Sequence, residues 1–348
     1  MVKPKALIVA PSFQSFILQD LKALSEKYDL TINHYNWKKK ELAPIYLIRQ
    51  FFHLLVNVPQ SRFIIIHFGG YWSFFPTLLG KVFGKPSYII LHGTDCASIP
   101  ELNYGSLRIP LLKFFCKFSY DWATLLLPVS SSLVRHSNEF YRQTPPLSSG
   151  FAHHFPELKT PYQIIPNGFE VEFWKTPSGN QRKEGSFLAV LSAEQYILKG
   201  VDLIVELAKR FPENTFKIAG FDKPIRQQNP SPNLEFLGKL SPSAMRSAYQ
   251  QSSFYFQLSV FEGFGCALCE AMLSGCIPIV SSVNELPHIV GNFGYILGKR
   301  DSNQLEKIIR KALSSPPSAE DRIAVRQRIE SLFPFEYRKK RLLEVLPK

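Results

Sequence analysis

The chain of 348 residues has no apolar run of the roughly 20 residues that a helix needs to cross a bilayer. Its first apolar stretch, Ala6 to Ala10, is too short for the core of a signal peptide and predicts a first strand instead. Only five cysteines are present, an odd number that does not form the even framework of a disulfide-rich secreted domain. We therefore expect a cytoplasmic protein.

Other patterns that would identify a function are also missing. No Gly-x-Gly-x-x-Gly follows the first predicted strand, which argues against a dinucleotide-dependent oxidoreductase. No zinc-finger, RRM-like or KH-like pattern is present, so we expect no nucleic-acid partner. Cys266 and Cys269 have no second Cys or His pair at zinc-like spacing nearby, which favours small buried side chains on a helix over a metal or redox pair.

Acidic residues are few relative to basic ones. The chain has 28 Asp and Glu against 41 Lys and Arg, a net charge of +13. Residues 1–180 carry 18 − 11 = +7 and residues 181–348 carry 23 − 17 = +6, so the excess is not confined to a tail. This balance fits an anionic partner, either a nucleotide diphosphate or the lipid headgroups at the inner face of a membrane.

What the chain does have is a regular alternation of strand and helix patterns, which predicts an α/β fold with parallel sheets. Its length suits two domains, and the turn-rich segment Thr176 to Asn180 is the best linker. We predict domains at 1–176 and 181–325 and a last helical segment at 326–348. The predicted strands are 5–10, 30–34, 63–67, 88–92, 125–129, 163–165, 187–191, 215–219, 234–237, 254–258 and 277–280, and a helix is predicted at 131–141 among others.

The most informative segment contains two carboxylates, Glu262 and Glu270, between a predicted strand and a predicted helix. Gly263 and Gly265 in the connecting turn let the backbone approach a ligand closely, and the start of a helix offers unpaired N–H groups to an anion. A helix that begins near Gly263 places Glu270 about two turns along it. The pair is therefore expected to flank a ligand with an anionic group and hydroxyls.

This segment resembles the Glu-x7-Glu motif of retaining glycosyltransferases of the family-four type. Ser259 fits the Ser-x-x-Glu-Gly-Phe-Gly run of that family, and residues 270–280 fit its continuation into a helix, a glycine and a strand. The resemblance implies the GT-B fold, in which two Rossmann-like domains face each other across a cleft and the C-terminal helix crosses back to the first domain. It also implies transfer of a hexose, with retention of configuration, from a nucleotide-diphosphate sugar of the UDP or GDP type to an acceptor hydroxyl.

The resemblance also implies roles for residues of the second domain. Lys199 is expected to bind the donor phosphates and to act in catalysis, and Glu262 is expected beside the transferred sugar as a catalytic group. Glu270 would accept hydrogen bonds from the ribose. The other donor-binding positions are Gly238, near the base, and Gly263, Phe264, Gly265 and Cys266, near the sugar and diphosphate. The arginine that usually precedes the lysine is absent, because residues 191–196 read Leu-Ser-Ala-Glu-Gln-Tyr, and Arg182 or Lys183 is the candidate substitute.

In the first domain, two histidines lie at the carboxyl ends of predicted strands, where ligands bind in open α/β sheets. His92, in the family-like segment Leu91 to Asp95, is the third expected catalytic residue. The expected acceptor-binding positions are His67, Gly69, Gly70 and Asp95. Aromatic residues near this site either form an apolar entry for a lipid acceptor or belong to the helix core: Phe13, Phe16, Tyr71, Trp72, Phe74 and Phe75.

The chain contains no Asp-x-Asp pair, so we expect no metal and no other cofactor. Lys199 and helix-end N–H groups would instead neutralise the leaving group. A role in cell-surface polysaccharide or glycolipid synthesis, with a sugar or lipid-linked acceptor, is the preferred interpretation. Two alternatives remain open: a nucleotide-sugar epimerase on the same fold, and a non-catalytic partner subunit of another transferase.

Overall fold

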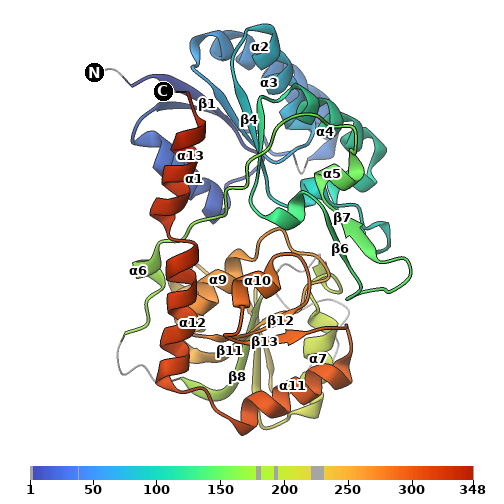
Figure 1. Cartoon of the computed structure of the whole chain (residues 1–348), viewed down its shortest axis with the longest axis vertical. Coiled ribbons are helices and arrows are strands. Elements are labelled where there is room, and N and C mark those ends of the chain that lie inside the picture. The colour runs from blue at the N-terminus through green and yellow to red at the C-terminus, as the bar shows by residue number, and fades with distance from the viewer. Residues whose placement is uncertain (1–2, 38, 178–181, 192–194, 221–230, 348) are drawn as a thin grey trace. The chain divides into compact units, whose positions relative to one another are not determined.

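The computed structural model describes residues 3–37, 39–177, 182–191, 195–220 and 231–347. The chain divides into two compact units, each built around a parallel sheet (Figure 1). The first unit comprises residues 1–136, 148–168 and 335–348, and the second comprises residues 137–147 and 169–334. The predicted α/β class is confirmed. In the described part of the chain, no helix is both long and apolar enough to cross a membrane.

The sheet of the first unit has the strand order β2-β1-β3-β4-β5, and all of its neighbouring strands are parallel. Its central strands are continuous apolar runs such as Ile64–Ile66, because helices cover both faces of a parallel sheet. The strand bounds are β1 Lys5–Val9, β2 Asp29–Asn33, β3 Ile64–His67, β4 Ser87–Leu91 and β5 Leu125–Pro128.

The helices of this unit lie in two layers. The chain moves from β1 to β2 in one direction and from β2 through β5 in the other, so right-handed crossovers place α1 (Ser15–Ser25) on one face and the next three helices on the opposite face. α2 (Ala43–Gln60), α3 (Tyr71–Val82) and α4 (Pro110–Trp122) pack side by side there (Figure 1). The short elements are α5 Phe151–His154 and 3-10 turns at Lys40–Leu42, Thr94–Cys96, Pro100–Leu102 and Ser106–Arg108.

The C-terminal helix α13 (Phe335–Val345) packs against α1 through a buried ion pair. Nε and Nη2 of Arg338 each donate a 2.6 Å hydrogen bond to an oxygen of Asp20, and Nη1 donates to the carbonyls of Ile165 and Pro166 at 2.9 Å. The segment predicted at 326–348 thus divides: α12 (Ala319–Leu332) belongs to the second unit, and only residues 335–348 belong to the first.

The sheet of the second unit has the order β10-β9-β8-β11-β12-β13 and is also parallel. Its core contains stacked phenylalanines: the ring of Phe187 lies 5.0 Å from Phe216, 5.0 Å from Phe254 and 5.1 Å from Phe256. The bounds are β8 Lys183–Val190, β9 Thr215–Ala219, β10 Leu234–Gly238, β11 Ser252–Gln257, β12 Ile277–Ser281 and β13 Tyr295–Leu297.

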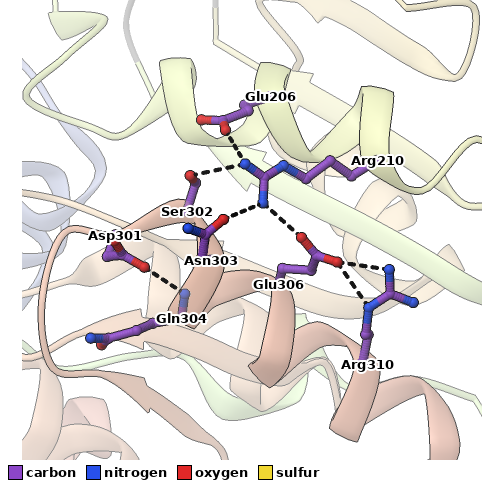
Figure 2. Close-up of polar contacts among 8 residues, drawn as sticks. All are labelled: Glu206, Arg210, Asp301, Ser302, Asn303, Gln304, Glu306 and Arg310. Carbon is purple, nitrogen blue, oxygen red and sulfur yellow. Dashed lines mark hydrogen bonds and ion pairs between the residues drawn. The ribbon is translucent and has the colours of Figure 1, made fainter.

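Polar contacts join the helices on one side of this sheet. Arg210, at the end of α7 (Val201–Arg210), donates to Asn303 Oδ1 at 2.8 Å and to Glu306 Oε2 at 2.6 Å on α11 (Ser302–Ser314), as Figure 2 shows. Asp301 caps α11 by accepting from the N–H of Gln304 at 2.7 Å. The remaining helices are α6 Val171–Trp174, α8 Pro242–Gln251, α9 Cys266–Leu273 and α10 Leu286–Val290.

Two local predictions are wrong. The helix predicted at 131–141 is a 3-10 turn at Ser131–Leu133 followed by β6 (His136–Asn138), which pairs with β7 (Leu147–Ser149). Residues 137–147 pack with the second unit, where the N–H of Arg300 donates to the carbonyl of Phe140 at 3.0 Å, so long-range pairing replaced the helical bonds. The strand predicted at 163–165 is an extended segment bonded to β5 without being a regular strand. Of the predicted linker, residues 178–180 lie outside the described residues.

Candidate active site

Glu262 lies in the turn between β11 and α9, and its carboxylate is held by three neighbours. Oε2 accepts hydrogen bonds from Lys199 Nζ at 2.6 Å, Gln257 Nε2 at 2.7 Å and Ser259 Oγ at 3.1 Å. The backbone N–H of Glu262 donates to Asn284 Oδ1 at 3.0 Å. A charge-assisted bond of this kind is among the strongest in proteins, so Lys199 and Glu262 form a preorganised, electrically neutral pair.

Lys199 reaches this position from the N-terminus of α7. Gly200, which follows it, has φ +74°, and a Cβ there would lie 2.6 Å from Leu258 Cβ and from the Leu258 carbonyl oxygen. The N–H of Val260 donates to the Leu198 carbonyl at 2.7 Å, which ties the two loops together. Only glycine fits this close crossing, and the crossing brings the lysine to Glu262.

Glu270 has a different environment. It lies on α9, which begins at Cys266, three residues later than predicted, after Gly265 with φ +109°. Its Oε2 accepts a hydrogen bond from the Tyr249 hydroxyl at 3.3 Å. Burial raises the pKa of Glu270 to about 8, and the bond from Tyr249 lowers it by less. Further hydrogen-bond donors to this carboxylate would lower its pKa, because they stabilise the ionised form.

The strand order brings the predicted donor-side residues to one edge of the second sheet. Lys199 follows β8, Glu262 follows β11 and Gly238 ends β10, and all of these strands are parallel. Gly238 has φ +66°, and its carbonyl accepts from the N–H of Gly220 at 2.7 Å. The carboxyl edge of a parallel sheet is where ligands bind in α/β folds. Gly263, Phe264, Gly265 and Cys266 lie at the same edge, in the turn and at the start of α9.

The substitute predicted for the absent arginine is wrong. Arg182 lies at the amino end of β8, opposite the Lys199 edge, and donates to the carbonyls of Tyr249 at 2.7 Å and Ser252 at 2.6 Å. Lys183 begins β8 at the same end. Both positions follow from the strand direction, so neither side chain can join the edge that holds Lys199. Residues 192–194, where the arginine is expected, lie outside the described part of the chain.

In the first unit, His67 ends β3 and His92 follows β4, and the two rings meet. His67 Nδ1 and His92 Nε2 are 3.2 Å apart, and Phe16 and Phe68 pack on His92 with ring centroids at 4.6 and 4.4 Å. Burial lowers the pKa of His67 to about 4, and burial together with His67 lowers the pKa of His92. Both imidazoles are therefore neutral at pH 7. Within the described residues, His67 Nε2 and His92 Nδ1 are buried and have no hydrogen-bond partner.

Asp95 braces the two loops that carry these histidines. Oδ2 accepts from the N–H of Gly69 at 3.0 Å, and Oδ1 accepts from the N–H groups of His92 at 3.1 Å and Gly93 at 2.9 Å. Burial raises the pKa of Asp95 to about 6, while the backbone bonds hold it down. The structure thus places this carboxylate against backbone in a fully buried position, which is a positioning role for the histidine loops.

The glycines beside His67 are in close contact with other groups. A Cβ on Gly69 would lie 2.1 Å from the Tyr120 hydroxyl oxygen, and a Cβ on Gly70 would lie 2.7 Å from the Trp72 ring. Of the aromatic residues left open above, Tyr71, Phe74 and Phe75 pack between helices, with Phe115 and Phe51 as partners. Phe16, by contrast, packs on His92 and so belongs to the surroundings of the histidine pair.

Residues 172–328 match the family model described as glycosyl transferases group 1. The matched segment, a little under half of the chain, is thus similar to group 1 glycosyltransferases. It contains Lys199, Gly238, Glu262 and Glu270. The resemblance to GT-B glycosyltransferases is therefore confirmed.

Two curated relatives share part of the chain. One subunit of the phosphatidylinositol N-acetylglucosaminyltransferase of Arabidopsis thaliana is 24% identical over 166 residues, which are 44% of this chain and 37% of that protein. GDP-mannose:cellobiosyl-diphosphopolyprenol alpha-mannosyltransferase of Xanthomonas oryzae pv. oryzae (strain PXO99A) is 26% identical over 179 residues, 47% of this chain and 46% of that protein. The chain thus spans less than half the length of each relative.

Solved structures resemble the whole chain in fold. Sucrose-phosphate synthase of Thermosynechococcus elongatus has a TM-score of 0.77 at 13% identity and covers 99% of this chain and 98% of its own. HepE of Anabaena in complex with UDP has a TM-score of 0.74 at 14% identity, with 98% and 99% covered. At these identities the likeness shows the fold alone, and that fold is the predicted GT-B type.

Sequence reasoning missed three residues that shape the group 1 site. Gln257 and Asn284 hold the side chain and the backbone of Glu262, and Tyr249 holds Glu270. Gln257 receives a 2.7 Å bond from the buried Tyr255 hydroxyl, which orients its amide. Of the three, only Gln257 could have been recognised in the sequence, because it is a polar residue at the end of an apolar strand. Asn284, with φ +50°, and Tyr249 come from segments distant in the sequence.

Proposed function

We propose that the chain is a retaining hexosyltransferase that takes its sugar from a nucleotide-diphosphate donor of the UDP or GDP type. The observation that carries the proposal is the Lys199–Glu262 pair beside the start of α9, with Glu270 on the same helix, inside the segment that is similar to group 1 glycosyltransferases. This arrangement offers a cation and helix-end N–H groups to a diphosphate and two carboxylates to hydroxyls.

The first proposed step is an exchange of partners at Lys199. A diphosphate carries more negative charge than one carboxylate, so it attracts the ammonium group of Lys199 away from Glu262. Gln257 and Ser259 keep the released carboxylate in place, since both donate to the same oxygen. Glu262 then accepts hydrogen bonds from the hydroxyls of the sugar. In the free protein, Lys199 and Glu262 thus bind each other until the sugar donor replaces both partners.

Glu270 is proposed to bind the ribose hydroxyls. Hydroxyl groups that donate hydrogen bonds stabilise the ionised carboxylate. Binding of the nucleotide-sugar therefore lowers the pKa of Glu270, which burial has raised to about 8. During transfer, Lys199 and the N–H groups at the start of α9 stabilise the charge on the leaving diphosphate. The departing phosphate accepts the proton of the acceptor hydroxyl, so the proposal needs no dedicated base and no metal.

The acceptor is proposed to be a sugar or a lipid-linked sugar, in polysaccharide or glycolipid synthesis. Two relatives support a glycan or lipid acceptor by name, one acting on phosphatidylinositol and one on a diphosphopolyprenol. On this proposal His92 hydrogen-bonds a sugar hydroxyl as a neutral imidazole, with His67, Gly69 and Gly70 near the acceptor and Asp95 bracing their loops. The uncompensated nitrogens of the histidine pair support such a role, because a buried polar atom without a partner costs free energy until a ligand supplies one.

The decisive experiment is calorimetry of the protein with UDP-, GDP- and ADP-sugars, followed by product analysis with the donor that binds. The expected product keeps the anomeric configuration of the donor, as measured by NMR coupling constants. Turnover of the donor without any acceptor would favour a nucleotide-sugar epimerase instead. Failure to bind any nucleotide-sugar would favour the non-catalytic partner, the alternative that the absent arginine motivates.

A further inference from the structure

The outer face of α2 carries an exposed apolar stripe. Its buried residues Gln50, Leu54 and Val58 face the sheet, whereas Ile45, Ile48, Phe52 and Val56 are 50% to 62% exposed. The spacing of these four residues, three and then four and four, places them in one row along the helix. The helix therefore has a second apolar face that the described part of the chain leaves uncovered.

The neighbouring helices extend this surface. Val82 and Phe83, at the end of α3, are exposed, as are Leu111 and Phe114 on α4. α2, α3 and α4 form one layer on the first sheet (Figure 1). Along α4 a groove of about 740 Å³ has aromatic walls and charged residues of both signs; its lining includes Phe114, Phe118, Phe155, Lys113, Lys117, Asp121 and Glu157. We call the exposed apolar residues of these three helices the outer face.

The charges on these helices have one predominant sign. α2 and α3 contain no Asp or Glu, and Asp121 is the sole acid of α4. The basic residues Arg49, Lys81, Lys113 and Lys117 are all exposed. Long basic side chains lie along apolar surface while their charged ends stay in water. Apolar residues with a basic surround complement a bilayer surface that has anionic headgroups.

We propose that the outer face of α2, α3 and α4 docks the protein onto the surface of an anionic membrane. The exposed apolar residues enter the headgroup region, and the arginine and lysines bind lipid phosphates. Each basic residue near such a surface raises the binding constant by roughly fivefold, and the effect falls with salt. The inference is independent of the proposed function, since it involves no residue of the Lys199 edge or the histidine pair.

The test is sedimentation of the full-length protein with sucrose-loaded vesicles. Vesicles of phosphatidylcholine and phosphatidylglycerol in a two-to-one ratio are expected to bind the protein at low salt. Pure phosphatidylcholine vesicles are expected to bind about tenfold or more weakly, and high salt is expected to weaken binding to the anionic vesicles. Protein that stays in the supernatant with anionic vesicles at low salt would overturn the proposal.

Variants locate the surface. The double variant Ile48→Glu with Phe52→Glu is expected to lower the binding constant by about tenfold or more, because it removes two inserting side chains and adds negative charge. Ile323→Glu, on α12 of the second unit, is the matched control, since Ile323 is 54% exposed and helical, and it is expected to bind as the wild type does.

A second variant keeps the test sound should the double variant fold poorly. Lys113→Ser with Lys117→Ser leaves the apolar residues intact. This variant is expected to bind anionic vesicles more weakly than the wild type, and its binding is expected to depend less on salt. Thermal melts check the fold of each variant. Equal sedimentation of wild type and both variants would contradict the proposal. A second outcome would also contradict it. If the wild type forms a dimer in sedimentation velocity and does not bind vesicles, and the Glu variant is a monomer, then the outer face binds a second copy of the chain.

Discussion

Glu262 and Glu270 are eight residues apart in the chain, yet their surroundings differ in charge. Lys199 pairs with the carboxylate of Glu262, whereas burial disfavours the charged form of Glu270. Glu262 has an ammonium group at 2.6 Å and two further donors on the same oxygen. Glu270 has a phenol hydroxyl at 3.3 Å, and burial raises its pKa. A single substitution at each position therefore probes a different part of the proposed mechanism.

Glu270→Gln is expected to weaken donor binding and to remove its pH dependence. In the wild type, ribose hydroxyls bind the ionised carboxylate, so donor affinity rises with pH as Glu270 loses its proton and levels off above about 8. The loss of charge-assisted hydrogen bonds predicts roughly tenfold to a hundredfold weaker binding at pH 8. Calorimetry between pH 6 and pH 9 measures both effects. A variant with wild-type affinity and the same pH profile would rule out this assignment.

Lys199→Ala is expected to lower turnover by roughly a hundredfold to a thousandfold, because it removes a preorganised charge from the leaving group. The free energy of unfolding should fall by only about 1–3 kcal/mol, since Gln257 and Ser259 still bind Glu262. Initial rates and urea unfolding give the two values. Lys209→Ala, at the far end of α7, is the control and should keep normal turnover. Normal turnover with a large loss of stability in Lys199→Ala would make the pair purely structural.

At the scale of elements, the interaction of α13 with α1 depends on one buried ion pair. Arg338 and Asp20 are both almost fully buried, and Nε and Nη2 of Arg338 donate to different carboxylate oxygens of Asp20. Removing one partner leaves the other charged, buried and uncompensated. The neighbouring pair of Lys339 and Glu26 is more exposed, which provides a comparison on the same helix.

Arg338→Ala is expected to lower the free energy of unfolding of the first unit by about 3–5 kcal/mol. Lys339→Ala should have a much smaller effect, because exposed ion pairs contribute little to stability. Urea titrations followed by circular dichroism compare the two variants. The double variant Arg338→Met with Asp20→Leu should recover much of the loss, since it removes both buried charges. Equal stability of Arg338→Ala and Lys339→Ala would show that α13 is held by its apolar contacts.

At the scale of the whole molecule, the proposed donor site belongs to one unit. Lys199, Gly238, Glu262 and Glu270 all lie in the second unit, and the histidine pair lies in the first. The two units are formed by separate stretches of chain, with two exceptions. Residues 137–147 belong to the second unit although stretches of the first unit flank them in the sequence, and residues 335–348 belong to the first unit although they follow the second.

Saturation with the nucleoside diphosphate that binds best is expected to slow amide exchange at residues 195–201 and 258–270. Amides of the central strands β1 and β3 should not change, because they contribute nothing to the proposed donor site. Hydrogen–deuterium exchange followed by mass spectrometry measures both regions in one experiment. Protection confined to β3, β4 and their loops would place the nucleotide on the first unit and contradict the assignment.

The alternation of apolar strands and amphipathic helices was enough to predict parallel sheets and most strand positions, and the resemblance to family-four glycosyltransferases implied that Lys199 and Glu262 act at one donor site. The sheets and strand positions depend on local periodicity, and parallel strands share a carboxyl edge. Residues 131–141 were predicted wrongly because their pairing partners, β7 and Arg300, lie elsewhere in the chain. Arg182 was offered as a substitute on its charge alone, although it precedes the strand that Lys199 follows, and the two residues therefore lie at opposite ends of that strand.

The sequence by itself therefore determined the α/β class, because short-range patterns encode strands, turns and glycine positions, and its motif resemblance pointed to the two carboxylates and their lysine. Only the tertiary structure decided that Glu262 is ion-paired with Lys199 whereas Glu270 is bonded by the hydroxyl of Tyr249, that Asp95 accepts from backbone N–H groups, and that the exposed row on α2 is uncovered in the described part of the chain. Those properties depend on which distant side chains surround a residue, and burial and charge act through space irrespective of order along the chain.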